Sequence, residues 1–84
     1  MARAFKALAD PTRVSIVNRL GEQGVEEVCV GELTAEFELS QPTISHHLRV
    51  LRDAGIVECR HSGTWSYYRL VPETISSLAS VLGG

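Results

Sequence analysis

The sequence predicts one mainly helical domain that carries a single β-hairpin near its C-terminus. Its 84 residues allow one core, and an apolar fraction of 44% with 21% charged residues fits a folded globular domain. Apolar residues recur at helical spacing between Gly and Pro breaks. Two runs rich in β-branched and aromatic residues flank a Ser-Gly pair and predict the hairpin. The expected order over residues 1–84 is α-α-α-α-β-β-α.

The first two helices are expected around residues 4–8 and from Pro11 onward. Asp10 can accept hydrogen bonds from free backbone amides, and Pro11 suits the first helical position. Gly21 and Gly24 are expected to end the second helix. Its apolar stripe is expected to comprise Val14, Val17 and Leu20, with Ile16 beside them.

Residues 28–30 are interpreted as a short extended or pre-helical piece, followed by a third helix around residues 31–39. Ser40 is expected to cap a fourth helix of about 14 residues, roughly 20 Å long. Pro42 lies in its first turn, and Gly55 suits a left-handed terminator. The residues expected to face the core are Leu33 and Phe37 on the third helix and Ile44, Leu48 and Leu51 on the fourth.

The hairpin is expected to join residues 56–60 to residues 65–70. If Ser62 and Gly63 form its two-residue turn, Arg60 pairs with Trp65 and Val57 with Tyr68. One face then carries Val57, Cys59, Ser66, Tyr68 and Leu70, and the other carries Glu58, Arg60, Trp65, Tyr67 and Arg69. Pro72 opens a last short helix with apolar positions Ile75, Leu78, Ala79 and Leu82.

Two short helices with a tight turn between them, followed by a two-stranded ribbon, are typical of a winged helix-turn-helix. With its apolar stripe turned inward, the second of these helices exposes short polar and basic side chains on its N-terminal half. Such groups can contact base edges and phosphates in the major groove. They are Gln41, Thr43, Ser45, His46 and Arg49. Ser40 either caps the helix or contacts DNA, and the two roles can coexist.

The net charge of −2 conceals an uneven distribution. Residues 1–39 have a balance of −3, whereas residues 40–70 have a balance of +2 and hold all three histidines. Binding of a polyanion depends on where cations cluster, so the acidic average does not exclude nucleic acid.

Three stretches resemble the ArsR/SmtB family of metal- and metalloid-responsive repressors: residues 8–13, 39–57 and 63–70. The resemblance implies a homodimer that binds a two-fold symmetric operator in double-stranded DNA and is released by an inducer, a metal or metalloid among the candidates. It implies that the recognition-helix positions are Ser40, Gln41, Thr43, Ser45 and His46. It also implies a wing at residues 60–64, where Arg60, Ser62, Gly63 and Thr64 are the candidate DNA contacts.

The resemblance also locates an inducer site that is incomplete in this chain. Arsenic-sensing members carry two cysteines two residues apart at the start of the third helix, where two thiolates can grip one soft ion. Here Cys29 is present and Gly31 occupies the second position, so Cys29 is only a weak metal candidate. A second site in the family binds zinc through His and acidic residues of the last helix, and residues 72–84 offer only Glu73 to it. Either this regulator senses something else, or its ligands lie on residues beyond these.

Two side chains, His47 and Arg60, have alternative interpretations, and Cys59 has one. His47 is expected to be a hydrogen-bonded structural histidine, with base reading as the alternative. Arg60 either stacks on Trp65 and stiffens the wing or reaches a phosphate. Cys59 is expected on the inward hairpin face as a small hydrophobic residue.

Other functional classes are disfavoured. No acid-base pair or phosphate loop accompanies the histidines, so an enzyme is not expected. No apolar run reaches the ~20 residues that span a bilayer, so no membrane partner is expected. The two cysteines lack a CxxC spacing, and the start lacks a secretory signal, which favours a cytoplasmic location. The alternative to DNA binding is a winged-helix module that contacts only proteins.

Overall fold

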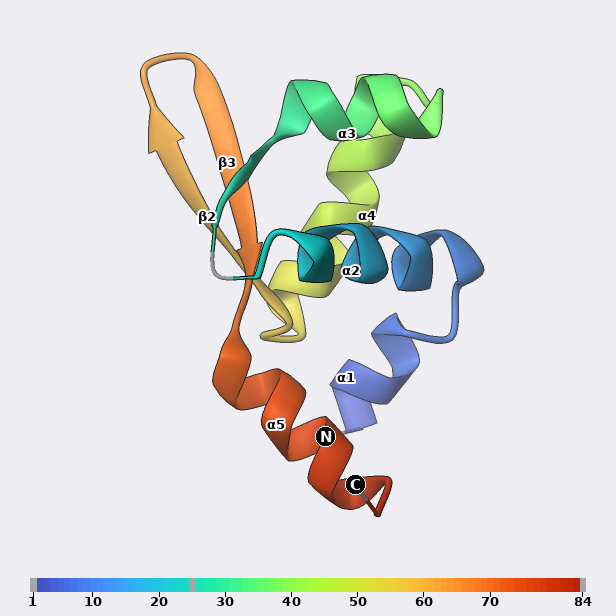
Figure 1. Cartoon of the computed structure of the whole chain (residues 1–84). Coiled ribbons are helices and arrows are strands. Elements are labelled where there is room, and N and C mark those ends of the chain that lie inside the picture. Colours follow the sequence, from blue (N-terminus) through green and yellow to red (C-terminus); the bar gives the residue numbers. More distant parts are fainter. Residues whose placement is uncertain (1, 25, 84) are drawn as a thin grey trace.

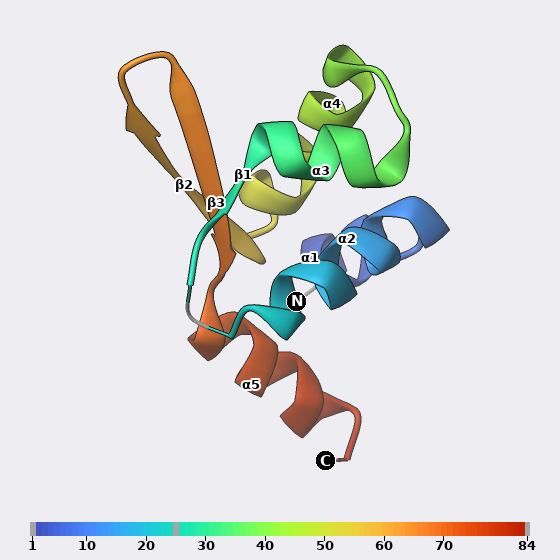
Figure 2. The same ribbon diagram turned by 45° about the horizontal axis from the view of Figure 1, so that its top comes forward.

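The computed structural model describes residues 2–24 and 26–83 (Figure 1). The expected elements are present, and the piece expected to be extended or pre-helical at residues 28–30 begins as a two-residue strand before the third helix. The elements are α1 (Ala2–Ala7), α2 (Pro11–Glu22), β1 (Val28–Cys29), α3 (Val30–Phe37), α4 (Gln41–Asp53), β2 (Val57–Ser62), β3 (Trp65–Leu70) and α5 (Pro72–Val81). Figures 1 and 2 both show the start of α4 and the tip of the β2–β3 hairpin toward one end of the molecule, with α5 toward the other.

Local capping fixes where α2 begins and where α4 begins and ends. The carboxylate of Asp10 accepts hydrogen bonds from the amides of Thr12 and Arg13 at 2.8 and 3.2 Å, and Pro11 follows as the first helical residue. Ser40 caps α4 in the same way, as expected, by accepting from the amide of Thr43 at 3.3 Å. Gly55 follows α4 with φ of 76°, a left-handed conformation that glycine adopts without a steric penalty.

The stripe predicted on α4 forms the centre of the core. Ile44, Leu48 and Leu51 are each 0% exposed, and so is Leu33 on α3. Burying one such side chain stabilises the fold by about 1.5–3 kcal/mol. The stripe therefore fixes which side of α4 faces the protein and which side faces solvent.

The stripe expected on α2 differs at one position. Ile16 and Leu20 are fully buried and Val17 is partly buried, but Val14 is 38% exposed. Val14 is two residues from Ile16, which places it about 200° around the helix from that buried side chain. The four-residue spacing of Ile16 and Leu20 therefore defines the buried face.

The sheet has three antiparallel strands in the order β1-β3-β2. The extended alternative for residues 28–30 is confirmed at β1, where Val28 pairs with Tyr68 and Cys29 with Tyr67. The expected hairpin register, by contrast, was wrong. Ser62 pairs with Trp65, so the turn is Gly63–Thr64, and Arg60 pairs with Tyr67 instead of Trp65. The offset is two residues, which preserves the two expected faces because side chains alternate with a period of two.

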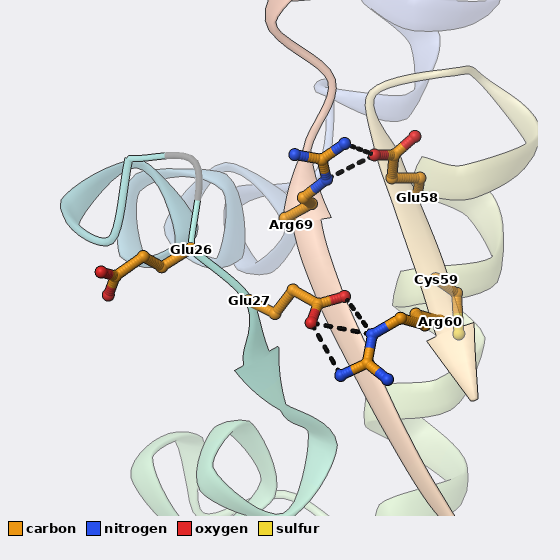
Figure 3. A pocket seen from close by; sticks show the side chains of 6 residues that line it. All are labelled: Glu26, Glu27, Glu58, Cys59, Arg60 and Arg69. Atoms are coloured by element: carbon orange, nitrogen blue, oxygen red, sulfur yellow. Dashed lines mark hydrogen bonds and ion pairs between the residues drawn. The ribbon is translucent and has the colours of Figure 1, made fainter. Parts of the chain in front are cut away.

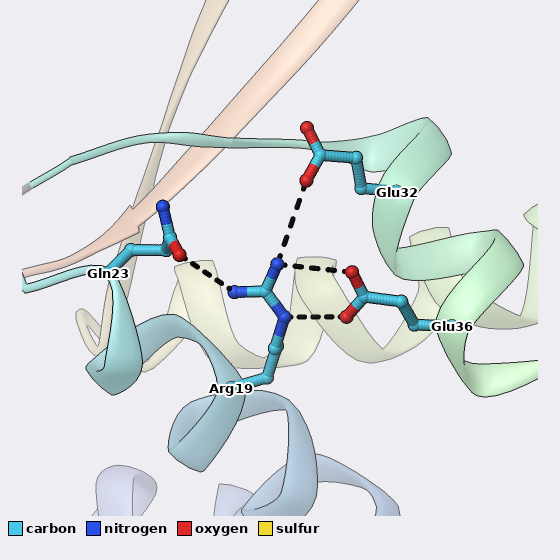
Figure 4. Close-up of polar contacts among 4 residues, drawn as sticks. All are labelled: Arg19, Gln23, Glu32 and Glu36. Carbon is cyan, nitrogen blue, oxygen red and sulfur yellow. Dashed lines mark hydrogen bonds and ion pairs between the residues drawn. The ribbon is translucent and has the colours of Figure 1, made fainter.

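An ion-pair cluster holds α2 against α3, the first helix of the helix-turn-helix (Figure 4). Arg19 donates to both carboxylate oxygens of Glu36 at 2.5 and 3.1 Å, and it lies 3.6 Å from Glu32. The hydrogen bond from Arg19 lowers the pKa of Glu36. Two parallel bonds from one guanidinium also restrict the relative orientation of the two helices.

The last helix is less covered than the sequence suggests. Leu78 is buried, but Val81 and Leu82 are 59% and 75% exposed. Within the described ranges, 2–24 and 26–83, none of the helices has the length and apolar character needed to cross a membrane.

Candidate nucleic-acid interface

The predicted reading face of α4 is solvent-exposed along its whole length. The apolar stripe behind this face is fully buried. All six side chains expected on the face are exposed: Ser40, Gln41, Thr43, Ser45, His46 and Arg49. The hydroxyl of Ser40 also donates to the hydroxyl of Thr43 at 2.9 Å. This bond orders two polar groups at the helix N-terminus, where the helix dipole favours a phosphate.

His47 points away from that face. Its side chain is half-buried, and its Nδ1 lies 3.3 Å from Nη1 of Arg13 on α2. The interpretation of His47 as a hydrogen-bonded structural histidine is therefore confirmed. The neighbouring His46 is exposed, with its ring centroid 5.7 Å from that of His47. The two histidines divide between the protein side and the solvent side of one helix.

The wing presents its tip to solvent. Ser62, Gly63 and Thr64 are all exposed, and Gly63 has φ of 62° at the first position of the two-residue turn. That sign of φ is required there by a type II′ turn, which matches the twist of the flanking strands. Small residues at the tip leave backbone groups accessible to a phosphate.

Arg60 is held on the outer face of the sheet (Figure 3). Its Nε donates to both carboxylate oxygens of Glu27 at 2.9 Å, and its guanidinium lies 4.8 Å from the ring centre of Tyr67. The expected partner Trp65 was wrong because the register places Tyr67 opposite Arg60. The residues just before β1 are thereby tied to the hairpin, which supports a role in stiffening the wing.

A second pair, Glu58 with Arg69, lies beside the first. The two pairs surround an open hollow of about 580 Å³ lined by Glu26, Glu27, Glu58, Cys59, Arg60 and Arg69 (Figure 3). Since each arginine there already faces a carboxylate, this side of the sheet offers little uncompensated positive charge to a phosphate.

The two cysteines are free thiols in different surroundings. Cys29 lies next to Gly31 at the start of α3. Cys59 is half-buried on the inner face, where its sulfur lies 3.7 Å from Nε2 of His61. Burial and then a hydrogen bond with Cys59 raise the pKa of Tyr68 to about 12. Cys59 is thus more polar in its contacts than the expected small hydrophobic residue. Across residues 2–24 and 26–83, no three His, Cys, Asp or Glu side chains gather as a metal site.

Two contacts of the interface had no signal in the sequence. Arg13 anchors His47 across 34 residues, and Glu27 anchors Arg60 across 33 residues. Each pair forms only after distant segments have packed together. Arg13 lies in a stretch that the sequence singled out, residues 8–13, but its target could not be inferred from spacing.

The sequence profile described as "Bacterial regulatory protein, arsR family" matches residues 10–58. An uncharacterised HTH-type transcriptional regulator of Methanocaldococcus jannaschii is 42% identical, over 96% of this chain and 89% of its own length. An arsenic resistance transcriptional regulator of Pseudomonas putida is 49% identical, over 95% of this chain and 61% of its own length. The arsenical resistance operon repressor of Escherichia coli is 44% identical, over 93% of this chain and 65% of its own length.

Solved structures agree with the same architecture. A possible transcriptional regulator for arsenical resistance has a TM-score of 0.84 and 36% identity, covering 99% of this chain and 82% of its own. The homodimeric winged helix-turn-helix DNA-binding domain of a possible ArsR-family regulator of Mycobacterium bovis has a TM-score of 0.80 and 32% identity, covering 98% of this chain and 73% of its own. The predicted winged helix-turn-helix fold is confirmed.

Proposed function

Because this chain belongs to the arsR family of bacterial regulatory proteins, we propose that it is a transcriptional repressor that binds operator DNA as a homodimer. As a regulator of transcription, and not an enzyme, it would act in the cytoplasm. The reading unit is the N-terminal half of α4 together with the tip of the wing.

The observation that carries this proposal is the two-sided character of α4. One side is an apolar stripe with no exposure, and the other is a continuous row of exposed hydroxyl, amide, imidazole and guanidinium groups. A helix in the major groove needs short hydrogen-bonding side chains of this kind at its N-terminal half. In a module that contacts only proteins, this helix face would not need to be polar and free of large apolar residues.

We assign the contacts by their position. Gln41, Ser45 and Arg49 lie one turn apart along α4, and they are the proposed base readers because their spacing follows one helix face. The remaining contacts are proposed to bind the phosphate backbone: Ser40, Thr43 and His46 on the helix, and Ser62, Gly63 and Thr64 on the wing. Arg60 is proposed to stiffen the wing and not to bind a phosphate, because its guanidinium is paired with Glu27.

A homodimer would place two reading units on one duplex. In this chain α1 and α5 carry apolar side chains that the monomer leaves open to solvent: Phe5 at 37%, Val81 at 59% and Leu82 at 75% exposure. A second copy that covers them would bury apolar surface, which a chain of this size needs for stability. Two-fold symmetry of the dimer predicts a two-fold symmetric operator.

The inducer is proposed to bind elsewhere than at the start of α3. Relatives are named for arsenical and cadmium resistance, but one thiolate at Cys29 cannot chelate a soft ion by itself. The likeness in fold therefore supports DNA reading in this chain without supporting arsenite sensing.

The test is duplex binding measured by fluorescence anisotropy at several salt concentrations. The probe is a duplex selected by the protein from a random-sequence library. We expect affinity that falls steeply with salt, because phosphate contacts release counterions. The variant Gln41→Ala should bind more weakly, whereas Asn18→Ala, an exposed amide on α2, should bind like the original. If the protein binds no duplex at low salt, it is a protein-interaction module and not a repressor.

A further inference from the structure

Arg13 joins three helices on the protein side of the reading unit. Its Nε donates to the carbonyl oxygen of Ala7, the last residue of α1, at 2.6 Å. Its Nη1 lies 3.3 Å from Nδ1 of His47 in the middle of α4. Its own backbone lies in the first turn of α2, capped by Asp10. A single guanidinium therefore links the end of α1 and the start of α2 to the helix that carries the polar face.

The contact with Arg13 determines which nitrogen of a neutral His47 ring carries the proton. A guanidinium can only donate hydrogen bonds, so the Nδ1 atom must present a lone pair and the ring proton must lie on Nε2. A protonated imidazole has a donor at both nitrogens and would face the guanidinium with a like charge. The link between α2 and α4 therefore exists only while His47 is neutral.

The charged and titratable groups around His47 come from few elements. The N-cap of α2 contributes Asp10, whose pKa is lowered first by the backbone hydrogen bond from Arg13 and further by the charge of Arg13. α4 itself contributes His46. The contact of α1 at this point is the carbonyl of Ala7, while Arg3 of α1 reaches the carbonyl of Asp53 at the end of α4 at 3.4 Å. Asp10 and Arg13 bring opposite charges near the ring, and only a neutral ring accepts a hydrogen bond from Arg13.

We propose that Arg13 is a positioning residue for DNA recognition, which fixes α4 relative to α1 and α2 through the neutral imidazole of His47. The proposal rests on the proposed function, since the position of α4 affects affinity only if α4 reads DNA. Histidine changes its charge between pH 5 and 8. A protonated ring no longer accepts from Arg13, so acidification should lower sequence-specific DNA affinity.

His47→Asn separates the hydrogen bond from the titration. The Asn Oδ1 atom can accept from Arg13 in place of Nδ1, but the amide does not change charge. For the original protein we expect affinity for its selected duplex to fall about five- to tenfold from pH 7.5 to 5.5, which corresponds to the net contribution of one ordinary hydrogen bond. His47→Asn should show a flatter profile. Both proteins keep His46, so its contribution cancels in the comparison.

Two arginine variants complete the design. Arg3→Ala removes a different α1–α4 contact that involves no titratable partner, and it should follow the pH profile of the original protein. Arg13→Lys keeps the positive charge, but one ammonium cannot reach both the carbonyl of Ala7 and Nδ1 of His47, as the guanidinium does. It should weaken binding at pH 7.5 while preserving the circular dichroism spectrum. Parallel pH profiles for the original protein and His47→Asn would overturn the proposal.

The contact can also be measured without DNA. Nitrogen-15 chemical shifts of the imidazole should report the Nε2–H tautomer of His47 in the original protein and in Arg3→Ala. Arg13→Lys should show a mixture of tautomers, and an unchanged Nε2–H tautomer there would show that Arg13 does not fix the ring. If no duplex is bound at any pH, the proposed function fails, and the tautomer measurement still decides whether Arg13 holds His47.

Discussion

A Cβ atom added at Gly31 would stand 3.9 Å from the sulfur of Cys29. The same atom would lie 3.8 Å from Cζ3 of Trp65, so the indole ring borders the position. Two thiolates that share one metal ion lie roughly 3.5–4 Å apart, given metal–sulfur bonds of about 2.3 Å. The sulfur of a cysteine at position 31 would lie one bond beyond that Cβ, so a second thiolate at the start of α3 would be within reach of an ion held by Cys29.

Gly31→Cys should create a soft-ion site. We expect binding of Cd²⁺ and arsenite in the low micromolar range or tighter, because two thiolates replace one. Cd²⁺ binding is measured by the thiolate-to-metal absorbance in the ultraviolet. Trp65 is the only tryptophan and borders the site, so its fluorescence should change on arsenite binding.

Gly31→Ser is the matched control, since it adds the same Cβ and a polar atom but no thiol. Gly31→Cys combined with Cys29→Ser restores a single thiol. Neither control should bind either ion tightly, and Cys29→Ser alone should leave the response of the original protein unchanged. Abolished operator release by arsenite, antimonite or cadmium in Cys29→Ser would show that the lone thiol does sense the ion.

Replacing Gln41 or Ser45 by Ala should cost roughly 1–3 kcal/mol of binding free energy at the preferred duplex and relax the sequence choice there. Both residues are exposed on the face opposite the buried stripe, so the fold should be unaffected. The measurement compares anisotropy titrations on the selected duplex and on duplexes with single base changes. Losses of equal size on every sequence would assign these side chains to the phosphate backbone instead.

Local patterns predicted the elements well, because capping and periodicity act within a few residues. The stripe of Ile44, Leu48 and Leu51 follows the helical period, and Ser40 and Gly55 mark the ends of α4. The polar face could be predicted for the same reason: once the buried side of a helix is known, the exposed side follows by elimination.

Longer-range features had no comparable local signal. β1 has two residues and exists only by pairing with β3, some forty positions later. The hairpin register was ambiguous because Gly63 can occupy either position of a two-residue turn. The partner of Arg60 depended on both of these features, so Glu27 could not be identified before the strands were placed.

Arg60→Ala should destabilise the wing without flattening the salt dependence of DNA binding. The guanidinium is engaged by Glu27 and lies over Tyr67, so it is not free to neutralise a phosphate. Amide hydrogen exchange should become faster in β1 and at the facing residues of β3. Glu27→Gln should reproduce this effect, because it weakens the same pair from the other side. A salt slope reduced by about one in Arg60→Ala alone would instead establish a phosphate contact.

Acid should destabilise the fold through two carboxylates that arginines engage, Glu27 and Glu36. The hydrogen bond from Arg60 is the main cause that lowers the pKa of Glu27, and the bond from Arg19 does the same for Glu36. A carboxylate with a lower pKa in the folded state than in the unfolded chain contributes stability above the unfolded value, near 4.5, and loses it as pH falls through the folded value. The loss should therefore appear below about pH 5.

Urea unfolding at pH 7, 5, 4 and 3 measures this dependence. The double variant Glu27→Gln with Glu36→Gln should be less stable than the original protein at pH 7 and should change less between pH 5 and 3. Glu73→Gln is the matched control, because Glu73 forms no ion pair or side-chain hydrogen bond within the described ranges 2–24 and 26–83. It should leave the loss of stability between pH 5 and 3 unchanged, since it removes a carboxyl that no arginine engages. If the stability of the double variant fell as steeply between pH 5 and 3, Asp10 would dominate the response, because its pKa is also lowered by capping the helix amides.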